Sequence, residues 1–446
     1  MDDRTAPTLV IGLGRSGVAA ARLAVEDGAP VRVTDVRTAD ELDEVVAALP
    51  TSVEAVLGGH PASCLDGVRR VVVSPGVPAD APLLVAARAA GLEVLSEVEF
   101  AWRHRPDAPL VAVTGSNGKS TVTTLVGEML RAGGLSTAVG GNLGTASSQL
   151  VLEGGWECWV LEVSSFQTEL FVDLRPRVGV FLNLSQDHLE RHVDLAAYAA
   201  AKQRLFAAQR PQDAAVLNAD DVMSAATPTA ARRRLFSVGQ AADAWLDGTV
   251  LVLEGEPLVP ASEVALVGRH NLANALAAVL AADEMGIDRA SMGDVLRTFR
   301  GLDHRHREVW SHDGVRWIDD SKATNVGATL AALGGYPDGS VHLILGGQAK
   351  GQDFSILRDE VARATRRVYL IGVDAAVIAA ALGAAVPVET CGDLAEAVRR
   401  ARRLAVAGEW VLLAPACASF DQFSGYAERG DRFAELARGE EVAPCP

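Results

Sequence analysis

Two glycine-rich loops are the stretches of this 446-residue chain whose residue types and spacing could do chemistry. The second loop, TGSNGKST at 114–121, follows an apolar run and opens a helical pattern. In such a loop, backbone amides cradle phosphate oxygens, Lys119 neutralises charge on a triphosphate and Ser120 faces Mg²⁺. Val113 stands where the strict phosphate-loop pattern has its first glycine. We predict a triphosphate site formed by Gly115, Ser116, Asn117, Gly118, Lys119, Ser120 and Thr121.

A magnesium ion at this loop needs a carboxylate from a neighbouring strand end. Glu162 ends the apolar run 159–161 and fits that position. The same residue could be a solvated acid at the end of a strand. Together with the loop, we interpret it as a metal ligand.

The segment NLSQDHLERH at 183–192 follows another apolar run and holds two histidines four residues apart. On a helix, His188 and His192 would share one face and could form part of a zinc site. No third ligand at a suitable spacing supports zinc, and the sequence has no HExxH motif. We therefore place His188 near the phosphate site and expect His192 to be exposed.

The first glycine loop, GLGRSG at 12–17, also lies between an apolar run and a helical pattern that we expect to start near Val18. Glycines let a backbone approach a phosphate, and Asp35 stands where an acid usually meets a ribose hydroxyl. Arg37 would suit an extra phosphate or be an ordinary solvated charge. A tight turn without a ligand stays an alternative, because this pattern alone is weak. We predict a nucleotide site and leave the nucleotide open.

Short apolar runs alternate with alanine-rich helical stretches along the whole chain, which predicts parallel sheets covered on both faces. The predicted strands are Thr8–Ile11, Val31–Thr34, Val71–Val73, Leu110–Val113, Trp159–Leu161, Val178–Leu182, Val315–Ile318, Val341–Leu345, Val368–Ile371 and Trp410–Leu413. Polar stretches at Trp102–Pro109 and Asp303–Glu308 look like domain joints. The sequence thus predicts an α/β protein of three domains.

Composition limits the classes of function. The chain has 41 Lys and Arg against 57 Asp and Glu, a net charge of −16, which argues against a nucleic-acid partner. Its five cysteines are scattered without metal-binding spacing. The N-terminus does not resemble a signal peptide, and the most apolar helical stretch is too short for a bilayer. We expect a reduced, cytoplasmic protein with no membrane partner.

Seven motifs in one order resemble the Mur ligases over nearly the whole chain. They are TGSNGKST, LEVSSFQ, NLSQDHLERH, GRHNLANALAA, the His-Arg pair at 304–305, DDSKATN and APACASFDQF. The resemblance implies a Rossmann-like domain for a uridine nucleotide at 1–98, a central P-loop-type ATPase domain at 99–302, and a Rossmann-like amino-acid-binding domain at 303–446. We also expect a monomer, although the sequence does not determine the oligomeric state.

The resemblance further implies an ATP-dependent amide ligase with small-molecule substrates and an acyl-phosphate intermediate. DDSKATN and PACASFDQF favour the member that adds D-glutamate to UDP-N-acetylmuramoyl-L-alanine in peptidoglycan precursor synthesis. The chirality of the amino acid rests wholly on the resemblance.

Site residues carried over from the family fall into four groups. The UDP-substrate group is Arg15, Ser16, Asp35, Arg37, Ser74, Gly76, Asn142 and Ser164. The ATP group is the phosphate loop together with Asn271, Asn274, Arg305 and Asp320. The glutamate group is Lys322, Thr324, Lys350, Ser419, Phe420 and Tyr426. Catalysis falls to Lys119, Glu162, His188 and Lys202, and two Mg²⁺ ions would be held by Ser120, Glu162, His188 and Lys202, the last as a carbamate.

Two departures from the family affect these assignments. Val36 replaces a common threonine near the uridine, and Phe420 replaces a smaller aliphatic residue in the glutamate pocket. The second His-Arg pair at 306–307 makes the choice of Arg305 slightly ambiguous, and we choose it because it aligns with DDSKATN without a gap.

Rival interpretations are a nicotinamide dehydrogenase built on the first loop, a non-catalytic nucleotide-binding scaffold, a sister Mur ligase and folylpolyglutamate synthase. A dehydrogenase leaves the second loop, DDSKATN and PACASFDQF unexplained. The first loop together with DDSKATN favours the D-glutamate-adding enzyme over both related ligases.

Overall fold

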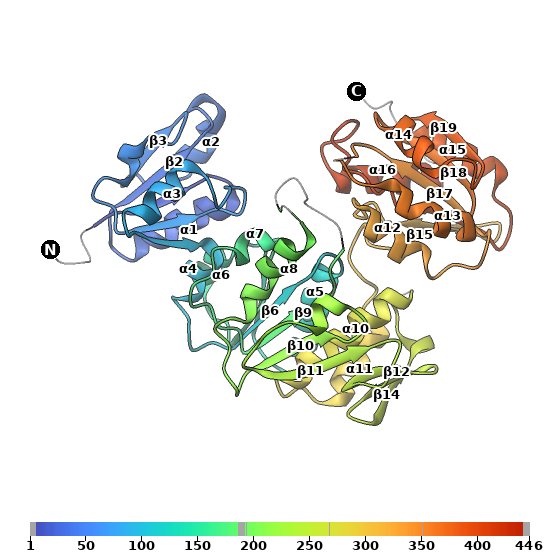
Figure 1. The fold of residues 1–446 in the computed structure, drawn as a ribbon, viewed down its shortest axis with the longest axis horizontal. Coiled ribbons are helices and arrows are strands. Elements are labelled where there is room, and N and C mark those ends of the chain that lie inside the picture. Colours follow the sequence, from blue (N-terminus) through green and yellow to red (C-terminus); the bar gives the residue numbers. More distant parts are fainter. Residues whose placement is uncertain (1–5, 186–191, 193, 267, 350, 440–446) are drawn as a thin grey trace.

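Three separate β-sheets, each covered by helices, make up the fold (Figure 1). The computed structural model describes residues 6–439 except 186–191, 193, 267 and 350. The N-terminal and C-terminal units lie on opposite sides of the central unit, with both glycine loops at carboxyl ends of strands (Figure 1). The predicted α/β fold class is confirmed.

The N-terminal sheet is fully parallel, with the strand order β3-β2-β1-β4-β5. Its elements are β1 (Thr8–Ile11), α1 (Arg15–Glu26), β2 (Val31–Asp35), α2 (Asp43–Ala47), β3 (Val53–Leu57), β4 (Arg70–Val73), α3 (Pro82–Ala89), β5 (Glu93–Ser96) and α4 (Glu97–Trp102). Helix α1 begins at Arg15, directly after Gly14 and three residues before the predicted start.

The central sheet has nine strands in the order β14-β13-β12-β11-β10-β9-β6-β8-β7. Its elements are β6 (Leu110–Thr114), α5 (Lys119–Ala132), β7 (Thr137–Gly141), α6 (Ser147–Glu153), β8 (Cys158–Glu162), α7 (Ser165–Thr168), β9 (Val178–Phe181), α8 (Leu195–Gln203), β10 (Ala214–Asn218), α9 (Val222–Ala225), β11 (Arg232–Ser237), β12 (Ala244–Asp247), β13 (Val250–Leu253), β14 (Glu256–Pro260), α10 (Arg269–Asp283) and α11 (Arg289–Thr298). β6 lies between β8 and β9, so its carboxyl end is surrounded by two other strand ends.

The C-terminal sheet runs β15-β16-β20-β17-β18-β19. Its elements are β15 (Arg307–His312), β16 (Val315–Asp319), α12 (Val326–Leu333), β17 (Val341–Gly346), α13 (Arg358–Ala364), β18 (Thr365–Ile371), α14 (Ala375–Leu382), β19 (Val388–Gly392), α15 (Leu394–Leu404), β20 (Trp410–Leu413) and α16 (Tyr426–Arg438). The loops that follow β16 and β20 are neighbours because these strands pair in parallel.

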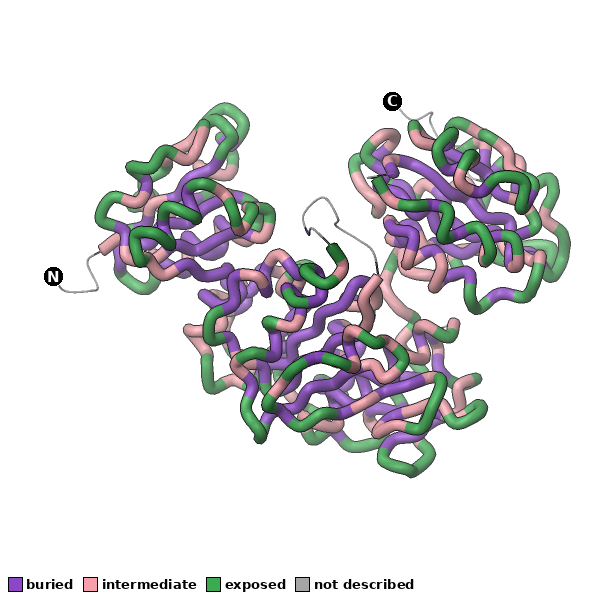
Figure 2. The backbone as a smooth tube through the Cα atoms, in the orientation of Figure 1, coloured by how far each residue is buried: buried purple, intermediate pink, exposed green. Residues whose placement is uncertain are grey.

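All ten predicted strands are found, and the central ones are the most deeply buried parts of each sheet (Figure 2). The sequence prediction missed edge strands such as β3 and the antiparallel pairings of β12, β13, β14 and β15. β3, β12, β14 and β15 carry exposed or charged side chains. β13 is an apolar run, VLVL, that was missed. Within the described ranges, every helix is too short or too polar to span a bilayer.

Candidate active site

The phosphate loop connects β6 to α5, and its backbone requires glycine at two positions. Gly115 has φ +152° and Gly118 has φ +85°, a region that other residues rarely adopt. A Cβ at Gly118 would stand 2.3 Å from Oδ1 of Asn274. The loop therefore packs directly on α10 and leaves the first amides of α5 as an anion-binding helix start.

Two lysines converge on this loop. Nζ of Lys119 donates to the carbonyls of Gly115 at 2.9 Å and Ser116 at 2.8 Å. Nζ of Lys202, on α8, donates to the same Gly115 carbonyl at 2.8 Å. Lys202 is only 1% exposed, and its ammonium lies 4.4 Å from the centre of the Tyr198 ring. It is thus a buried cation beside the loop and not a solvated helix lysine.

A buried carboxylate faces the start of α5. Glu162 accepts a hydrogen bond from the hydroxyl of Ser120 and another, 2.7 Å long, from Nδ2 of Asn142. Burial raises the pKa of Glu162, but the charge of Lys119 and these two hydrogen bonds outweigh it and leave the pKa below its usual value. The side chain is therefore ionised at neutral pH, as a cation ligand must be.

The C-terminal unit reaches into this cluster. A guanidinium NH2 of Arg305 donates to the hydroxyl oxygen of Ser120 at 2.7 Å. Nearby, Nδ2 of Asn325 lies 3.4 Å from Oδ1 of Asn117. Two of the three units thus meet at the phosphate loop, and side chains from both can contact one ligand there.

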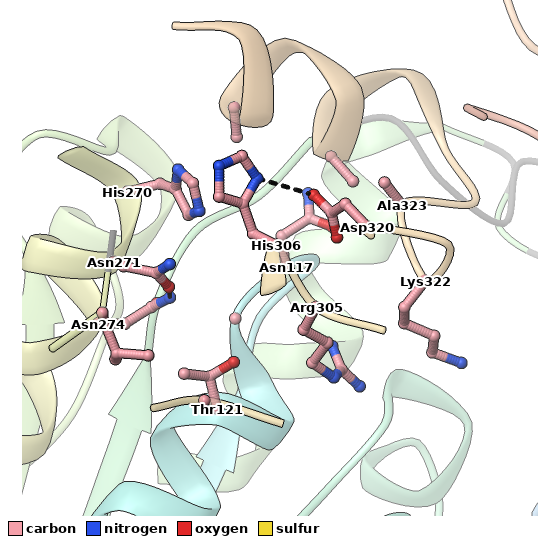
Figure 3. A pocket seen from close by; sticks show the side chains of 15 residues that line it. Asn117, Thr121, His270, Asn271, Asn274, Arg305, His306, Asp320, Lys322 and Ala323 are labelled. Atoms are coloured by element: carbon pink, nitrogen blue, oxygen red, sulfur yellow. Dashed lines mark hydrogen bonds and ion pairs between the residues drawn. The ribbon is translucent and has the colours of Figure 1, made fainter. Parts of the chain in front are cut away.

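A cavity lies between these two units, beside the phosphate loop (Figure 3). Its lining includes Asn117, Gly118, Thr121, Asn271, Asn274, Arg305, Asp320 and Lys322, which were predicted for nucleotide or amino acid, together with His270 and His306, which were not. Nδ2 of Asn274 donates to Oδ1 of Asn271 at 3.1 Å. The structure therefore brings the predicted ATP residues of two sheets into one place.

The predicted glutamate residues gather at the ends of β16 and β20. The ammonium of Lys322 lies 3.8 Å from the centre of the Tyr426 ring, and Ser419 is 2% exposed. Phe420, the departure from the family, is 67% exposed. Thr324 lies in the loop after β16, and Lys350 is outside the described residues.

Arg429 is a residue of this region that the sequence analysis missed. It is 1% exposed, and its guanidinium donates to the Ser321 hydroxyl and carbonyl at 3.0 and 2.8 Å and to the Cys417 carbonyl at 3.1 Å. It therefore fastens the loop after β16 to the loop after β20. No spacing in the α16 sequence distinguishes this arginine from the helix's surface charges.

The first glycine loop is built differently. Asp35 accepts from the Leu13 amide at 2.6 Å and from the Arg37 side chain at 3.0 and 2.9 Å, and these contacts outweigh burial and hold its pKa well below the usual range. The Ser74 hydroxyl donates to the Gly12 carbonyl at 2.7 Å. Arg15 is exposed at the start of α1, with Ser16 beside it, and Gly76 lies three residues beyond β4.

Ser164 and His192 both lie at the start of α7. Ser164 caps α7, and its hydroxyl accepts from the Gln167 amide. The expectation that His192 is exposed is wrong: it is 5% exposed, and Nε2 lies 3.0 Å from the Ser165 hydroxyl. His188 lies outside the described residues. In the described part of the chain, no group of three His, Cys, Asp or Glu side chains is arranged to hold a metal.

The fold and this geometry define a three-unit α/β protein whose phosphate loop faces a cavity between its central and C-terminal units. Family models match each unit: the Mur ligase MurD-like N-terminal domain at residues 6–96, the Mur ligase middle domain at 113–282 and the Mur ligase glutamate ligase domain at 304–417.

Full-length relatives agree. The chain is 45% identical to the UDP-N-acetylmuramoylalanine--D-glutamate ligase of Anaeromyxobacter dehalogenans, covering 96% of each chain. It is 43% identical to the protein of the same name from Alcanivorax borkumensis, covering 96% of this chain and 97% of that one. The chain belongs to the Mur ligase family.

Solved structures share the fold. UDP-N-acetylmuramate-alanine ligase MurC from Thermotoga maritima superposes with a TM-score of 0.59 at 20% identity, over 97% of this chain and 99% of that chain. A pseudomurein peptide ligase type C from Methanothermus fervidus gives a TM-score of 0.59 at 18% identity, over 92% and 96%.

Proposed function

We propose that this protein is an ATP-dependent, ADP-forming ligase that joins D-glutamate to UDP-N-acetylmuramoyl-L-alanine in cytoplasmic peptidoglycan precursor synthesis. The observation that supports it most is the convergence of Lys119, Lys202, Glu162 and Arg305 on one phosphate loop. The name and full-length similarity of the relatives support the choice of amino acid and acceptor.

The reaction must activate a carboxylate, because a carboxylate oxygen is a poor leaving group. A substrate carboxylate oxygen attacks the γ-phosphorus of ATP, ADP leaves, and an acyl phosphate forms. The amine of D-glutamate then attacks the acyl carbon, the C–O bond breaks, and phosphate leaves with that oxygen. Both steps gather negative charge, which cations held in place in a buried site stabilise most.

Lys119 and Arg305 are the cations we assign to these steps. Lys119 is held by two loop carbonyls, so its ammonium is already in place when phosphate arrives. Arg305 comes from the C-terminal unit and contacts Ser120 at the start of α5. Its guanidinium would therefore contact the transferred phosphoryl group from the C-terminal unit. Asn271, Asn274 and Asp320 would hold the adenine and ribose end in the cavity of Figure 3.

The residues at the loop fit a magnesium ion. Glu162 is ionised and its carboxylate shares a hydrogen bond with the Ser120 hydroxyl, so two hard oxygen ligands already adjoin each other. When bound, Mg²⁺ supplies charge neutralisation on the phosphates. We assign Ser120 and Glu162 to one ion, and His188 with Lys202 to a second.

Carbamylation of Lys202 would turn its amine into a carboxylate. This proposal is supported by the burial of Lys202 beside the Gly115 carbonyl, because a buried lysine does not serve as a solvated surface charge. Protein equilibrated with ¹³C-bicarbonate should show one carbamate resonance that the Lys202→Gln variant lacks. Identical spectra of the wild type and the variant would contradict the carbamate, and with it the assignment of Lys202 as a ligand of the second ion.

The N-terminal unit would bind the uridine nucleotide through Arg15, Ser16, Asp35, Arg37, Ser74 and Gly76, with Asn142 and Ser164 nearer the reacting end. Glutamate would meet Lys322, Thr324, Lys350, Ser419, Phe420 and Tyr426. We propose domain limits at 1–98, 99–302 and 303–446. The first limit falls inside α4, a helix that contacts both units. The proposal also includes a monomer without nucleic-acid or membrane partners.

Oxygen tracing tests the reaction. UDP-N-acetylmuramoyl-L-alanine labelled with ¹⁸O in its carboxylate should yield phosphate that carries one ¹⁸O, and only when D-glutamate and ATP are present. Unlabelled phosphate would show hydrolysis of ATP by water and would contradict the proposal.

A further inference from the structure

One imidazole in the cavity has no part in the assignments above. His306 follows Arg305 in the second His-Arg pair, and its side chain is 5% exposed. Its φ is +51°, an uncommon backbone conformation for a residue other than glycine. Uncommon backbone conformations cluster at functional sites, so this conformation beside a ligand cavity indicates a functional role for His306.

The ring of His306 connects two other side chains. Its Nδ1 lies 3.4 Å from Oδ2 of Asp320, and its Nε2 lies 3.1 Å from the Tyr336 hydroxyl. Figure 3 shows the ring between His270 and the Asp320 carboxylate. The three groups form a chain from a buried phenol to the cavity.

The direction of these hydrogen bonds follows from the phenol. Burial raises the pKa of Tyr336 far above neutral, so its hydroxyl stays protonated and can donate to Nε2. A neutral imidazole that accepts at Nε2 carries its proton on Nδ1, which therefore points at Asp320. Tyr336 thus selects the tautomer that donates to the carboxylate.

His270 does not disturb this arrangement. Its ring centre lies 5.3 Å from that of His306 with an edge-to-face angle of 82°. Burial lowers the pKa of His270 to about 4, so it is neutral at pH 7 and places no second charge beside His306. His270 packs against the ring, and the polar contacts of His306 go to Asp320 and Tyr336.

We propose that His306, oriented by Tyr336, is a positioning residue that fixes the Asp320 carboxylate for the ribose hydroxyls of the nucleotide. The inference rests on the proposed function, which places a nucleotide in this cavity. A carboxylate that accepts hydrogen bonds from two ribose hydroxyls must keep a fixed orientation. A hydrogen bond from His306 to one of its oxygens limits the rotation of the carboxylate. His306 would therefore determine how strongly the site prefers ribose over deoxyribose.

The test compares ATP with 2′-deoxy-ATP and 3′-deoxy-ATP in phosphate release. We expect the wild-type KM to be lower for ATP than for at least one analogue by about tenfold, the usual size of a hydrogen bond to a charged group. His306→Phe should raise the KM for ATP about tenfold, leave kcat within about threefold, and remove the preference over the analogue.

Three further variants separate positioning from packing. Tyr336→Phe keeps the ring and should lose part of the preference. His306→Asn suits the positive φ, places an amide donor near the Nδ1 position, and should restore it. His312→Asn changes an exposed histidine at the end of β15, the strand that begins directly after His306, and should behave as wild type. Thermal unfolding of each variant checks the fold.

The outcomes are distinct. A wild-type enzyme that uses all three nucleotides equally, or a His306→Phe enzyme that keeps the preference, overturns the inference. A variant whose KM rises equally for all nucleotides, without rescue by asparagine, shows a merely structural role and also overturns it. Absence of phosphate release from the wild type contradicts the proposed function instead, and calorimetric Kd values for the three nucleotides then test the inference directly.

Discussion

The two interfaces of the central unit differ in kind. Toward the N-terminal unit, α6 packs on α1 and α4, and Val151 and Leu152 join the apolar core of the N-terminal unit. Toward the C-terminal unit, polar contacts run through the phosphate loop, as in the Arg305–Ser120 and Asn325–Asn117 pairs.

A buried acid at the apolar interface makes the difference clearer. Glu97 is 1% exposed and accepts from the amide of Ser148, at the start of α6. It serves a helix end of the neighbouring unit, and burial raises its pKa to about 7. At the polar interface, by contrast, Glu162 is kept ionised by cations. One interface is built for stability and the other for ligand chemistry, so variants should separate the two.

The largest effect should come from Lys119→Ala, which removes the cation at the phosphate loop. We expect kcat to fall at least about 10³-fold, since cations aimed at developing charge are worth several kcal/mol in a buried site. The thermal midpoint should stay near that of the wild type. Arg131→Ala, on the exposed side of the same helix, is the control, and phosphate release is the measurement. A Lys119→Ala enzyme with near-normal kcat would refute the assignment.

Glu97→Gln should act on stability with little effect on kcat. The raised pKa means that the folded protein holds a proton that the unfolded chain releases, so this group costs stability as the pH rises from about 4.5 to about 7. Glutamine keeps an acceptor for the Ser148 amide and has no such cost. Above pH 7 the variant should be more stable by up to about 3 kcal/mol.

Urea unfolding at pH 5 and pH 8 measures this difference. The difference in the free energy of unfolding between variant and wild type should be small at pH 5 and larger at pH 8. Glu93→Gln, a partly exposed neighbour bound by Arg70 and Arg103, serves as the comparison. A gap that does not change with pH would mean that Glu97 is not protonated in the folded protein.

Gly118→Ala should damage the polar interface moderately. The new Cβ would meet Asn274 Oδ1 at 2.3 Å in a backbone with φ +85°, so the loop must shift. We expect KM for ATP to rise about tenfold and stability to fall by about 1–2 kcal/mol. In the other glycine loop, a Cβ added at Gly14 would have no neighbour within 4 Å. Gly14→Ala should therefore change neither the KM for ATP nor the thermal midpoint. Equal effects of the two substitutions would contradict this account.

The smallest effect should come from Asn325→Asp. Its carboxylate still caps α12 by accepting from the Ala328 amide but can no longer donate to Asn117. We expect a change in KM for ATP of about threefold or less, because the lost contact is long and uncharged. Asn325→Ala also loses the cap and should lower stability by about 1 kcal/mol. If the two variants have the same thermal midpoint, the cap contributes nothing measurable.

The strands predicted from the sequence all lie inside the three sheets, and the missed ones are the sheet edges together with the run from β10 to β13. β6 is a continuous apolar run and β17 is one interrupted by His342, whereas β11 begins with three arginines, which pair with β10. Edge strands are specified by their neighbours, so their own residues give a weak signal.

The same limit applies to the site. The phosphate loop was readable because its glycines and Lys119 are adjacent in sequence. Lys202, His192 and Arg429 are buried by segments distant in the chain, and nothing local marks them as buried. His306, directly before β15, pairs with Tyr336, in the loop after α12. The two residues are 30 positions apart, and no motif spacing in the sequence predicts that they meet.

The central claim is that this chain joins D-glutamate to UDP-N-acetylmuramoyl-L-alanine with ATP. Phosphate release should be measured with ATP, Mg²⁺, UDP-N-acetylmuramoyl-L-alanine and D-glutamate, omitting each in turn and replacing D-glutamate by L-glutamate. The account predicts release only when all four are present and none with L-glutamate. Equal release with L-glutamate would contradict the proposed amino acid, and release that does not depend on the uridine substrate would contradict the ligase itself.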